Sequence, residues 1–308
     1  MKRLLFLISF FLIPGLGSAY SQSCDRACLG EMLARYLDAV VAHDPSRAPL
    51  FTGFRQTENA VVVRPGTGVW ETVTALGDFG RRFYDPVTGH AAYFGLTEEG
   101  GDAAISTLRL RVEDREITEA EWFIARRDDP GLNGPVAAGR GGVWDADNLI
   151  ANPPPETPLG GRGGLSRRAL IAATNSYFDG ITSHDGSIIH AFPGCSRIEN
   201  GMTMTGRGGR GGAASDCTSG LETINISMVA ARRYPLVDEE AGVVLALAVF
   251  QRNPGTTTRR NVFAEWFFFE GDRIRTIYSA MFYPEAALPV PNWPPFDPNW
   301  PLNADTSN

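Results

Sequence analysis

One stretch of the sequence occurs twice. Residues 36–59 and residues 177–200 align at a constant offset of 141 without a gap, and they are identical at nine of 24 positions. Ordinary composition gives roughly one or two such matches by chance. The identical pairs are Tyr36/Tyr177, Asp38/Asp179, His43/His184, Asp44/Asp185, Ser46/Ser187, Phe51/Phe192, Gly53/Gly194, Glu58/Glu199 and Asn59/Asn200. A self-match at a fixed spacing predicts two copies of one domain in a single chain.

The first 19 residues have the composition of an export signal peptide. Lys2 and Arg3 precede an apolar run at 4–12, and the small residues 17–19 suit a cleavage site. The apolar run is too short to cross a bilayer as a helix, and no later stretch reaches about 18 uninterrupted apolar residues. We therefore expect a secreted or periplasmic protein that is not held in a membrane.

The charge balance argues against nucleic acid as a partner. Without Lys2 and Arg3, the 28 basic residues fall to 26 against 35 acidic residues, a formal charge of −9. Such a surface repels phosphate backbones and anionic membranes. The RGGRGG run at 207–212 is therefore interpreted as a loop and not as an RNA-binding tract.

Four cysteines in an exported chain indicate two disulfides, for which three pairings exist. Cys24 and Cys28 are four residues apart at the start of a helix, where the Cα separation suits a bridge. Cys195 and Cys217 would then close a Gly-rich loop. This pairing is favoured over the other two. The cysteines have no CxxC spacing, so we expect no zinc site, and no motif indicates another metal or a cofactor.

Each copy is expected to be a helix followed by strands, an α+β arrangement. Apolar residues recur at helical spacing over 29–40 and again over 170–181. The expected strands are Arg55–Arg64, His90–Leu96, Thr107–Glu113 and Ile117–Arg126, then Glu222–Arg232, Gly242–Gln251, Asn261–Glu270 and Ile274–Tyr283. The domains are expected at 24–127 and 165–288, with a Gly/Pro-rich linker at 128–164 and a Pro-rich tail at 289–308.

One strand predicts how the two copies meet. The run 263–269 is almost entirely apolar and does not alternate with polar residues. A strand that is apolar on both faces is covered on both faces. Its own helix covers one face, so we expect the sheet of the other copy to cover the second. The chain is then a monomer that contains an intramolecular pseudo-dimer.

The segment Arg35–Asp44, followed by a strand beginning at Thr57–Val61, resembles the SnoaL-like branch of the nuclear transport factor 2-like superfamily. The resemblance implies two tandem cone-shaped domains, each a long helix wrapped by a curved antiparallel sheet around a pocket. The mature chain is also similar to a secreted microbial family of unknown function, through residues 24–29, 36–46, 57–59, 197–201 and 232–239.

That superfamily includes cofactor-free enzymes such as ketosteroid isomerase, scytalone dehydratase, limonene-epoxide hydrolase and polyketide cyclases, and also non-catalytic binders. Tyr36 and Tyr177 fall where the isomerase has its oxyanion-stabilising tyrosine. Its basic aspartate falls near Arg64 and Thr205, which carry no carboxylate. The resemblance therefore implies a pocket without specifying one of these reactions.

Residues kept in both copies are more readily explained by the shared fold than by a site. Tyr36 and Tyr177 lie on the apolar faces of their helices, so each is interpreted as a core tyrosine, with donation to a ligand oxygen as the alternative. The repeated pairs at His43, Glu58 and Asn59 are interpreted as structural.

Polar residues that occur in one copy are the other candidates. Arg109 and Glu121 form either a cross-strand ion pair or a pocket pair of shifted pKa suited to acid–base chemistry. Arg197, Arg232 and Glu265 offer the same alternatives in the second copy. The candidate site residues are thus Tyr36, Arg109, Glu121, Tyr177, Arg197, Arg232 and Glu265.

Two hypotheses about function follow. The first is a cofactor-independent lyase, isomerase or hydratase that acts on a small apolar organic molecule in a cone pocket. The second is a non-catalytic secreted binder of a small hydrophobic ligand. The sequence leaves open whether the protein is an enzyme. A cavity of at least about 300 Å³ on which Tyr, Arg and Glu converge would favour the enzyme, whereas interiors filled by aromatic side chains would exclude it.

Overall fold

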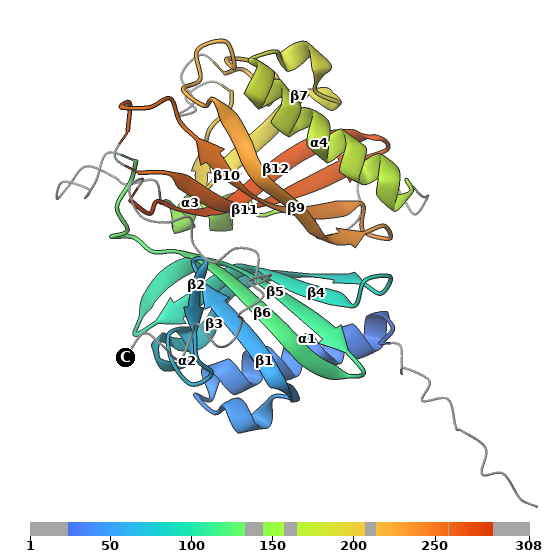
Figure 1. Ribbon diagram of the computed structural model, residues 1–308, viewed down its shortest axis with the longest axis vertical. Coiled ribbons are helices and arrows are strands. Elements are labelled where there is room, and N and C mark those ends of the chain that lie inside the picture. Colours follow the sequence, from blue (N-terminus) through green and yellow to red (C-terminus); the bar gives the residue numbers. More distant parts are fainter. Residues whose placement is uncertain (1–23, 133–143, 157–164, 207–213, 258, 286–308) are drawn as a thin grey trace, which may run out of the picture.

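The computed structural model describes residues 24–132, 144–156, 165–206, 214–257 and 259–285. These residues form an α+β structure of two six-stranded sheets, each preceded by a long helix (Figure 1). The first half consists of α1 (Arg26–Val41), η1 (Pro45–Arg47), β1 (Leu50–Glu58), β2 (Val61–Val63), α2 (Val69–Thr72), β3 (Val73–Asp85), β4 (His90–Glu99), β5 (Asp102–Glu113) and β6 (Glu116–Ala125). After α3 (Ala146–Ala151), the second half consists of α4 (Arg167–Ser183), η2 (Gly186–Ile188), β7 (Ala191–Glu199), β8 (Met202–Thr203), β9 (Met228–Asp238), β10 (Val243–Gln251), β11 (Asn261–Glu270) and β12 (Arg273–Phe282).

Both sheets have the same topology. The strand order is β2-β1-β6-β5-β4-β3 in the first and β8-β7-β12-β11-β10-β9 in the second. In each sheet one pair is parallel, β1 with β6 and β7 with β12, and the other pairs are antiparallel. The two tandem domains expected from the repeat are therefore supported by an identical order of strands in the two sheets.

The strand pairing gives a residue-by-residue correspondence between the halves. The pair Leu108/Trp122 on β5 and β6 corresponds to Glu265/Ser279 on β11 and β12. The pair Asp85/His90 on β3 and β4 corresponds to Asp238/Val243 on β9 and β10. The offset is 141 in the helices and first strands, and it widens to 153 and then 157 further along, because the second half contains insertions.

The long helices begin and end as their sequences predict. The Asp25 carboxylate accepts a hydrogen bond from the Cys28 amide at 2.9 Å, and the Ser166 hydroxyl caps α4 in the same way. His43 and His184 follow the helices with φ of 56° and 58°, and their imidazoles contact the backbone carbonyls of Trp70 in α2 and of Ile226 before β9. These histidines therefore have the structural role predicted for them.

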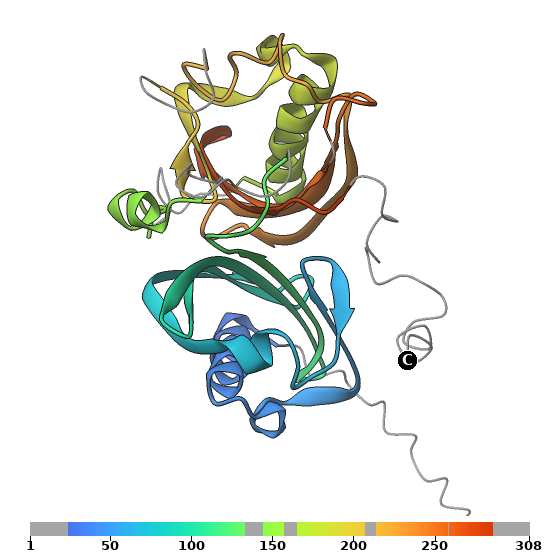
Figure 2. The same cartoon turned by 90° about the vertical axis from the view of Figure 1, so that its left-hand side faces the viewer.

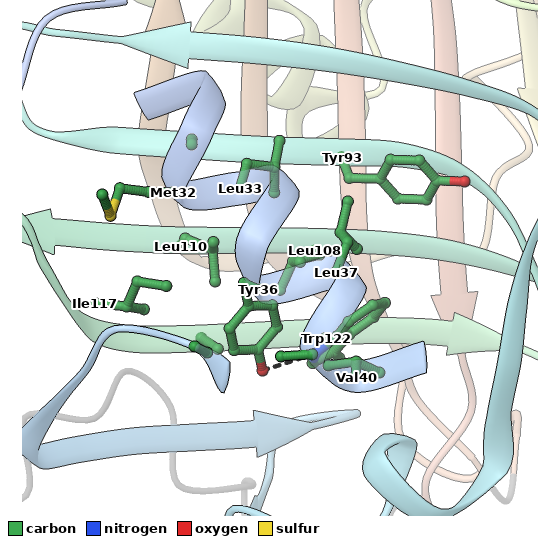
Figure 3. Packing of buried hydrophobic residues seen from close by; sticks show 14 of the residues in the cluster. Met32, Leu33, Tyr36, Leu37, Val40, Tyr93, Leu108, Leu110, Ile117 and Trp122 are labelled. Atoms are coloured by element: carbon green, nitrogen blue, oxygen red, sulfur yellow. Dashed lines mark hydrogen bonds between the residues drawn. The ribbon is translucent and has the colours of Figure 1, made fainter. Parts of the chain in front are cut away.

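The buried side chains form three clusters. One lies between α1 and the first sheet (Figure 3), and another lies between α4 and the second sheet. The third contains apolar side chains from both sheets, among them Phe83, Phe94 and Trp266. The rings of Phe83 and Trp266 are 5.0 Å apart between centroids. The views in Figures 1 and 2 show the two sheets facing each other, with the long helices on the outer sides.

Two ion pairs join the halves at corresponding positions. Arg26, at the start of α1, donates two hydrogen bonds to Asp238 at 2.8 and 2.9 Å. Arg167, at the start of α4, pairs with Asp85. The same carboxylates accept backbone amides from the opposite half: Asp238 from Tyr84 and Asp85 from Val237, each at 2.9 Å. Reciprocal contacts of this kind are typical of an interface with two-fold symmetry.

Several strand boundaries differ from the prediction. The expected strand Arg55–Arg64 is split into β1 and β2, because Asn59 and Ala60 form a tight turn with φ of 49° and 62°. The long strand β3 was not predicted, since its glycines and charges interrupt any alternation of apolar residues. The expected strand Glu222–Arg232 begins only at Met228 and continues to Asp238.

The disulfides and the connecting segment complete the fold. The bridges are Cys24–Cys28 and Cys195–Cys217, which confirms the favoured pairing. The expected linker contains the short helix α3, and its Asn148 amide donates to the Gly201 carbonyl at 2.5 Å. The expected signal peptide at 1–19, the RGG run and the tail at 289–308 lie outside the described residues.

Candidate functional site

The interior of the first half is filled around its helix tyrosine. The Tyr36 hydroxyl donates to Gln56 Oε1 at 2.9 Å and accepts from Trp122 Nε1 at 3.3 Å (Figure 3). Trp70 Nε1 donates to the same Gln56 oxygen at 2.7 Å. The phenol is fully buried, and burial raises its pKa. Tyr36 is therefore a core tyrosine whose hydrogen bonds are satisfied by neighbouring side chains, as the preferred interpretation predicted.

The corresponding tyrosine of the second half meets a charged group. Arg197, on β7, occupies the position of Gln56, and its Nη1 donates to the Tyr177 hydroxyl at 2.9 Å. Arg197 Nε lies 3.0 Å from Glu199 Oε1, as an ion pair without hydrogen-bond alignment. Burial raises the pKa of Tyr177, and the guanidinium partly opposes that rise. The structure thus brings two predicted site residues, Tyr177 and Arg197, into contact.

Glu265 is the third predicted residue in this region. It lies on β11 with neighbours Phe263 and Phe267 facing α4, and it is fully buried. Neither carboxylate oxygen has a hydrogen-bond partner among the described residues. Burial, with a smaller contribution from Glu199, raises its pKa well above the ordinary value, against the opposing effect of Arg197. Glu265 is therefore a buried carboxyl group without a hydrogen-bond partner among the described residues, and it interacts electrostatically with the Arg197 guanidinium.

Three large aromatic side chains of the first half are replaced by smaller ones in the second. Trp122 corresponds to Ser279 through the strand register. Tyr93 corresponds to Ala246, because each is paired across the sheet with Leu108 or Glu265. Trp70 corresponds to Ile226, since their carbonyls contact the equivalent His43 and His184. The replacement is not uniform: Phe250 and Phe263, in contact at 4.2 Å, take the places of Thr97 and Ser106.

A cavity of about 310 Å³ lies in the second half. Its polar lining includes Arg197, Glu199, Arg252 and Asn261. The loop that follows β8 supplies the largest share of the wall, from Ala214, Ser219, Gly220, Leu221, Thr223, Ile224 and Ile226. The Cys195–Cys217 disulfide ties this loop to β7. The first half has the short helix α2 here, and Trp70 of that helix fills the interior.

Arg109 and Glu121 lie elsewhere. They are directly paired across β5 and β6, and Arg109 Nε donates to Glu121 Oε2 at 2.6 Å, which confirms a cross-strand ion pair. The pair faces the second sheet, where Arg233 of β9 donates to Glu121 at 2.7 Å. Burial alone would raise the pKa of Glu121, but Arg109 and Arg233 lower it. These residues belong to the contact between the halves and not to the cavity.

Arg232 is also separate from the cavity. It binds the outer surface of α4 through Asp179, Asn175 and Thr182, and its guanidinium lies 5.6 Å from the centre of the Phe178 ring. These contacts fasten β9 to the helix. Asp179, which the helical spacing places in solvent, is half exposed and paired with this arginine.

Sequence reasoning missed two polar residues of the cavity, Arg252 and Asn261. Arg252 lies just beyond β10. Leu96 of β4 and Val249 of β10 are corresponding positions in the strand register, and Glu99 and Arg252 each follow three residues later, so Arg252 takes the position of Glu99. A comparison of the two copies would have revealed this reversal of charge. The widening offset concealed it, because the sequence match ends before either position.

No group of three or more His, Cys, Asp or Glu side chains in the described part of the chain is arranged to hold a metal ion. None of the helices within the described ranges is both long and apolar enough to span a bilayer.

The comparisons with known proteins concern the same half. Residues 164–281 match the model of a family described as a domain of unknown function (DUF8021). A search of curated protein sequences found no match. The matched segment contains α4 and all strands of the second sheet, and it ends one residue before the end of β12.

Proposed function

We propose that the protein binds a small organic molecule in the cavity of its second half. The observation that carries this proposal is the contrast between the two interiors at corresponding positions. In the first half, Trp70 and Trp122 pack around Tyr36. The second half instead has a cavity of about 310 Å³ that Arg197 helps to line. That volume lies at the lower end of the range for small-molecule sites.

The fold on which this proposal rests is a pair of SnoaL-like cones. In each half the helix packs against one face of the sheet, and a parallel pair joins the first strand to the last. The reciprocal pairs Arg26–Asp238 and Arg167–Asp85 support an intramolecular pseudo-dimer in which a single chain is complete as a monomer. In this arrangement the first half acts as a scaffold and the second half holds the ligand.

We also propose that the protein works outside the cytoplasm, as a secreted or periplasmic protein. Its two disulfides fit a chain that folds in an oxidising compartment. The Cys195–Cys217 bridge holds the loop that forms much of the cavity wall. Oxidation is then a condition for ligand binding as well as for stability.

A second candidate function is catalysis by the same half, as a cofactor-independent lyase, isomerase or hydratase. The observation that favours it is Glu265, a buried acid with no hydrogen-bond partner among the described residues and a raised pKa. Glu265 does not line the cavity, so in this function the ligand extends beyond the cavity lining to reach its carboxyl group, which as a carboxylic acid can donate a proton to a carbonyl oxygen. Deuterium exchange next to a ligand carbonyl in D₂O tests this function: as Glu265 protonates the carbonyl oxygen, solvent water accepts the proton from the neighbouring carbon, so Glu265→Gln should abolish that exchange.

Binding is tested by filling the cavity. The probes are a panel of small acids, alcohols and amides, detected by saturation-transfer NMR on the oxidised, mature chain. Met204 lines the cavity, so Met204→Trp should abolish the signals of bound probes. Met228 is half exposed on β9 and outside the lining, so Met228→Trp is the matched control. Binding that persists in Met204→Trp, or no binding by any probe, would refute the proposal.

A further inference from the structure

The charged residues around the cavity differ from their counterparts in the first half. There, Arg126 donates to Glu99 at 2.5 and 2.8 Å and to Glu58 at 2.9 Å, so that one guanidinium satisfies two carboxylates. In the second half Glu58 is retained as Glu199, but Glu99 is replaced by Arg252 and Arg126 by Tyr283. The first cluster therefore has two acids, Glu58 and Glu99, and one base, Arg126. The second has one acid, Glu199, and one base, Arg252, and Arg197 adds a further base.

The single acid of this cluster is already engaged. Glu199 Oε1 lies 3.0 Å from Arg197 Nε, and it forms no ion pair with Arg252 within 4.0 Å among the described residues. Glu265 does not line the cavity. Among the described residues that line it, Arg197 and Arg252 are positively charged and Glu199 is negatively charged, so this part of the wall has an excess of one positive charge.

Arg252 is the residue that holds the excess charge. Its partners are neutral carbonyl oxygens: Nε and Nη2 donate to Asn261 Oδ1 at 3.4 and 3.1 Å, and Nη1 donates to the Asn225 carbonyl at 3.3 Å. These hydrogen bonds are long compared with the 2.7–2.9 Å of charge-assisted pairs. Burial lowers the pKa of Arg252, because Glu199 and Tyr283 compensate only part of the lost hydration.

We infer that the ligand of the cavity is an anion, a small organic acid whose carboxylate pairs with the Arg252 guanidinium. This inference rests on the proposed binding function and specifies the class of its ligand. A carboxylate matches the two-pronged donor geometry of a guanidinium, and it would replace the long hydrogen bonds to neutral oxygens by short charged ones. The apolar part of the acid would lie against Ile181, Phe250 and the loop residues Leu221 and Ile224.

The test compares acids with amides of the same shape. Calorimetry on the oxidised mature chain would use benzoate against benzamide, and cyclohexanecarboxylate against cyclohexanecarboxamide. We expect each acid to bind at least about tenfold more tightly than its amide, since a charged hydrogen bond exceeds a neutral one by about that factor or more. Equal affinities for acid and amide would overturn the inference that the ligand is an anion, while leaving the proposed binding function intact. If neither the acids nor the amides bind, both the inference and the proposed function are overturned.

Variants assign the preference to Arg252. Arg252→Gln should lower the affinity for benzoate to that for benzamide without changing the affinity for benzamide, which also shows that the variant folds. Arg252→Lys should retain part of the preference. Arg275→Gln removes an exposed arginine on β12 and should change neither affinity. An unchanged preference in Arg252→Gln would overturn the assignment of the site.

Discussion

Where the core of the first half has Trp70, Tyr93 and Trp122, the second half has Ile226, Ala246 and Ser279 at the corresponding positions. The helix, the strand order and the turn residues are nevertheless the same. Asn59 exchanges two hydrogen bonds with the backbone of Ile124, and Asn200 does so with Met281. The fold is therefore maintained by residues that recur, and the interior is free to differ.

The comparison also separates two uses of buried charge. Arg109, Glu121 and Arg233 form a network between the sheets in which every charged group has a partner. In the second half, the Glu265 carboxyl oxygens have no partner in the described structure, and Arg252 at the cavity has only neutral acceptors. A buried network with all groups paired stabilises a fold, whereas incompletely satisfied groups at a cavity are available to a ligand.

The largest expected effect comes from making the first interior resemble the second. Trp122→Ser removes a buried ring and the donor to Tyr36, and it should lower the free energy of unfolding by about 4 kcal/mol. The matched change Ser279→Ala removes a buried hydroxyl with no hydrogen-bond partner among the described residues, and it should be neutral or stabilising by up to about 1 kcal/mol. Urea unfolding followed by circular dichroism measures both. A small loss in Trp122→Ser would show that the first interior is not tightly packed.

Next in size is the loss of the reciprocal contacts between the halves. Asp85→Ala and Asp238→Ala each remove a buried carboxylate that binds an arginine and a backbone amide of the opposite half. We expect each to reduce the free energy of unfolding by about 3 kcal/mol, with equal costs within error. Asp272→Ala, at an exposed acid, is the control and should change stability by less than about 0.5 kcal/mol. Clearly unequal costs would contradict a two-fold relation between the halves.

The two helix tyrosines should respond differently to loss of the hydroxyl. Tyr36→Phe breaks hydrogen bonds between neutral groups and should cost about 1 kcal/mol. Tyr177→Phe removes an acceptor from the buried Arg197 guanidinium and should cost about 2 kcal/mol. Chemical denaturation of both variants under the same conditions gives the comparison. Equal costs would mean that Arg197 finds another acceptor, such as Glu199.

The sequence predicted the repeated framework because a fold depends on residues that recur. The amphipathic helices and the aromatic run at 263–269 were evident from the sequence, and the spacing of the cysteines favoured the disulfide pairing that the structure has. Strand β3 was missed because its side chains are mostly half exposed and its glycines break the pattern. Alternation along β5 separates Arg109 from Leu108 and Leu110, but it does not say which face meets the other half.

The site was harder to predict, since it depends on residues that differ between the copies. Arg197 and Glu265 were identified as candidates because each is a charged residue that occurs in one copy only. Arg252 lies after a strand, where charged residues are common, and only the strand register pairs it with Glu99. The size of a cavity depends on how a loop closes, and no local sequence pattern specifies that.

The last expected effect is a dependence of stability on pH, and it arises from one residue of the second half. Glu265 corresponds to Leu108, so the second interior contains an acid where the first is apolar. Its folded pKa is raised by burial, so the folded state retains a proton that the unfolded state has lost. Stability from the neutral acid is present at low pH and declines as pH rises from the ordinary glutamate value toward the raised one.

Glu265→Gln removes this titration without changing the shape of the side chain. Between the ordinary and the raised pKa, the wild-type free energy of unfolding should fall relative to that of the variant by about 1.4 kcal/mol per pH unit. Urea unfolding at intervals of about one pH unit, from about pH 5 upward, measures the difference between the two proteins, in which all other titrating groups cancel. A constant difference across that range would show that Glu265 is ionised when folded, and the acid–base function would then lose its support.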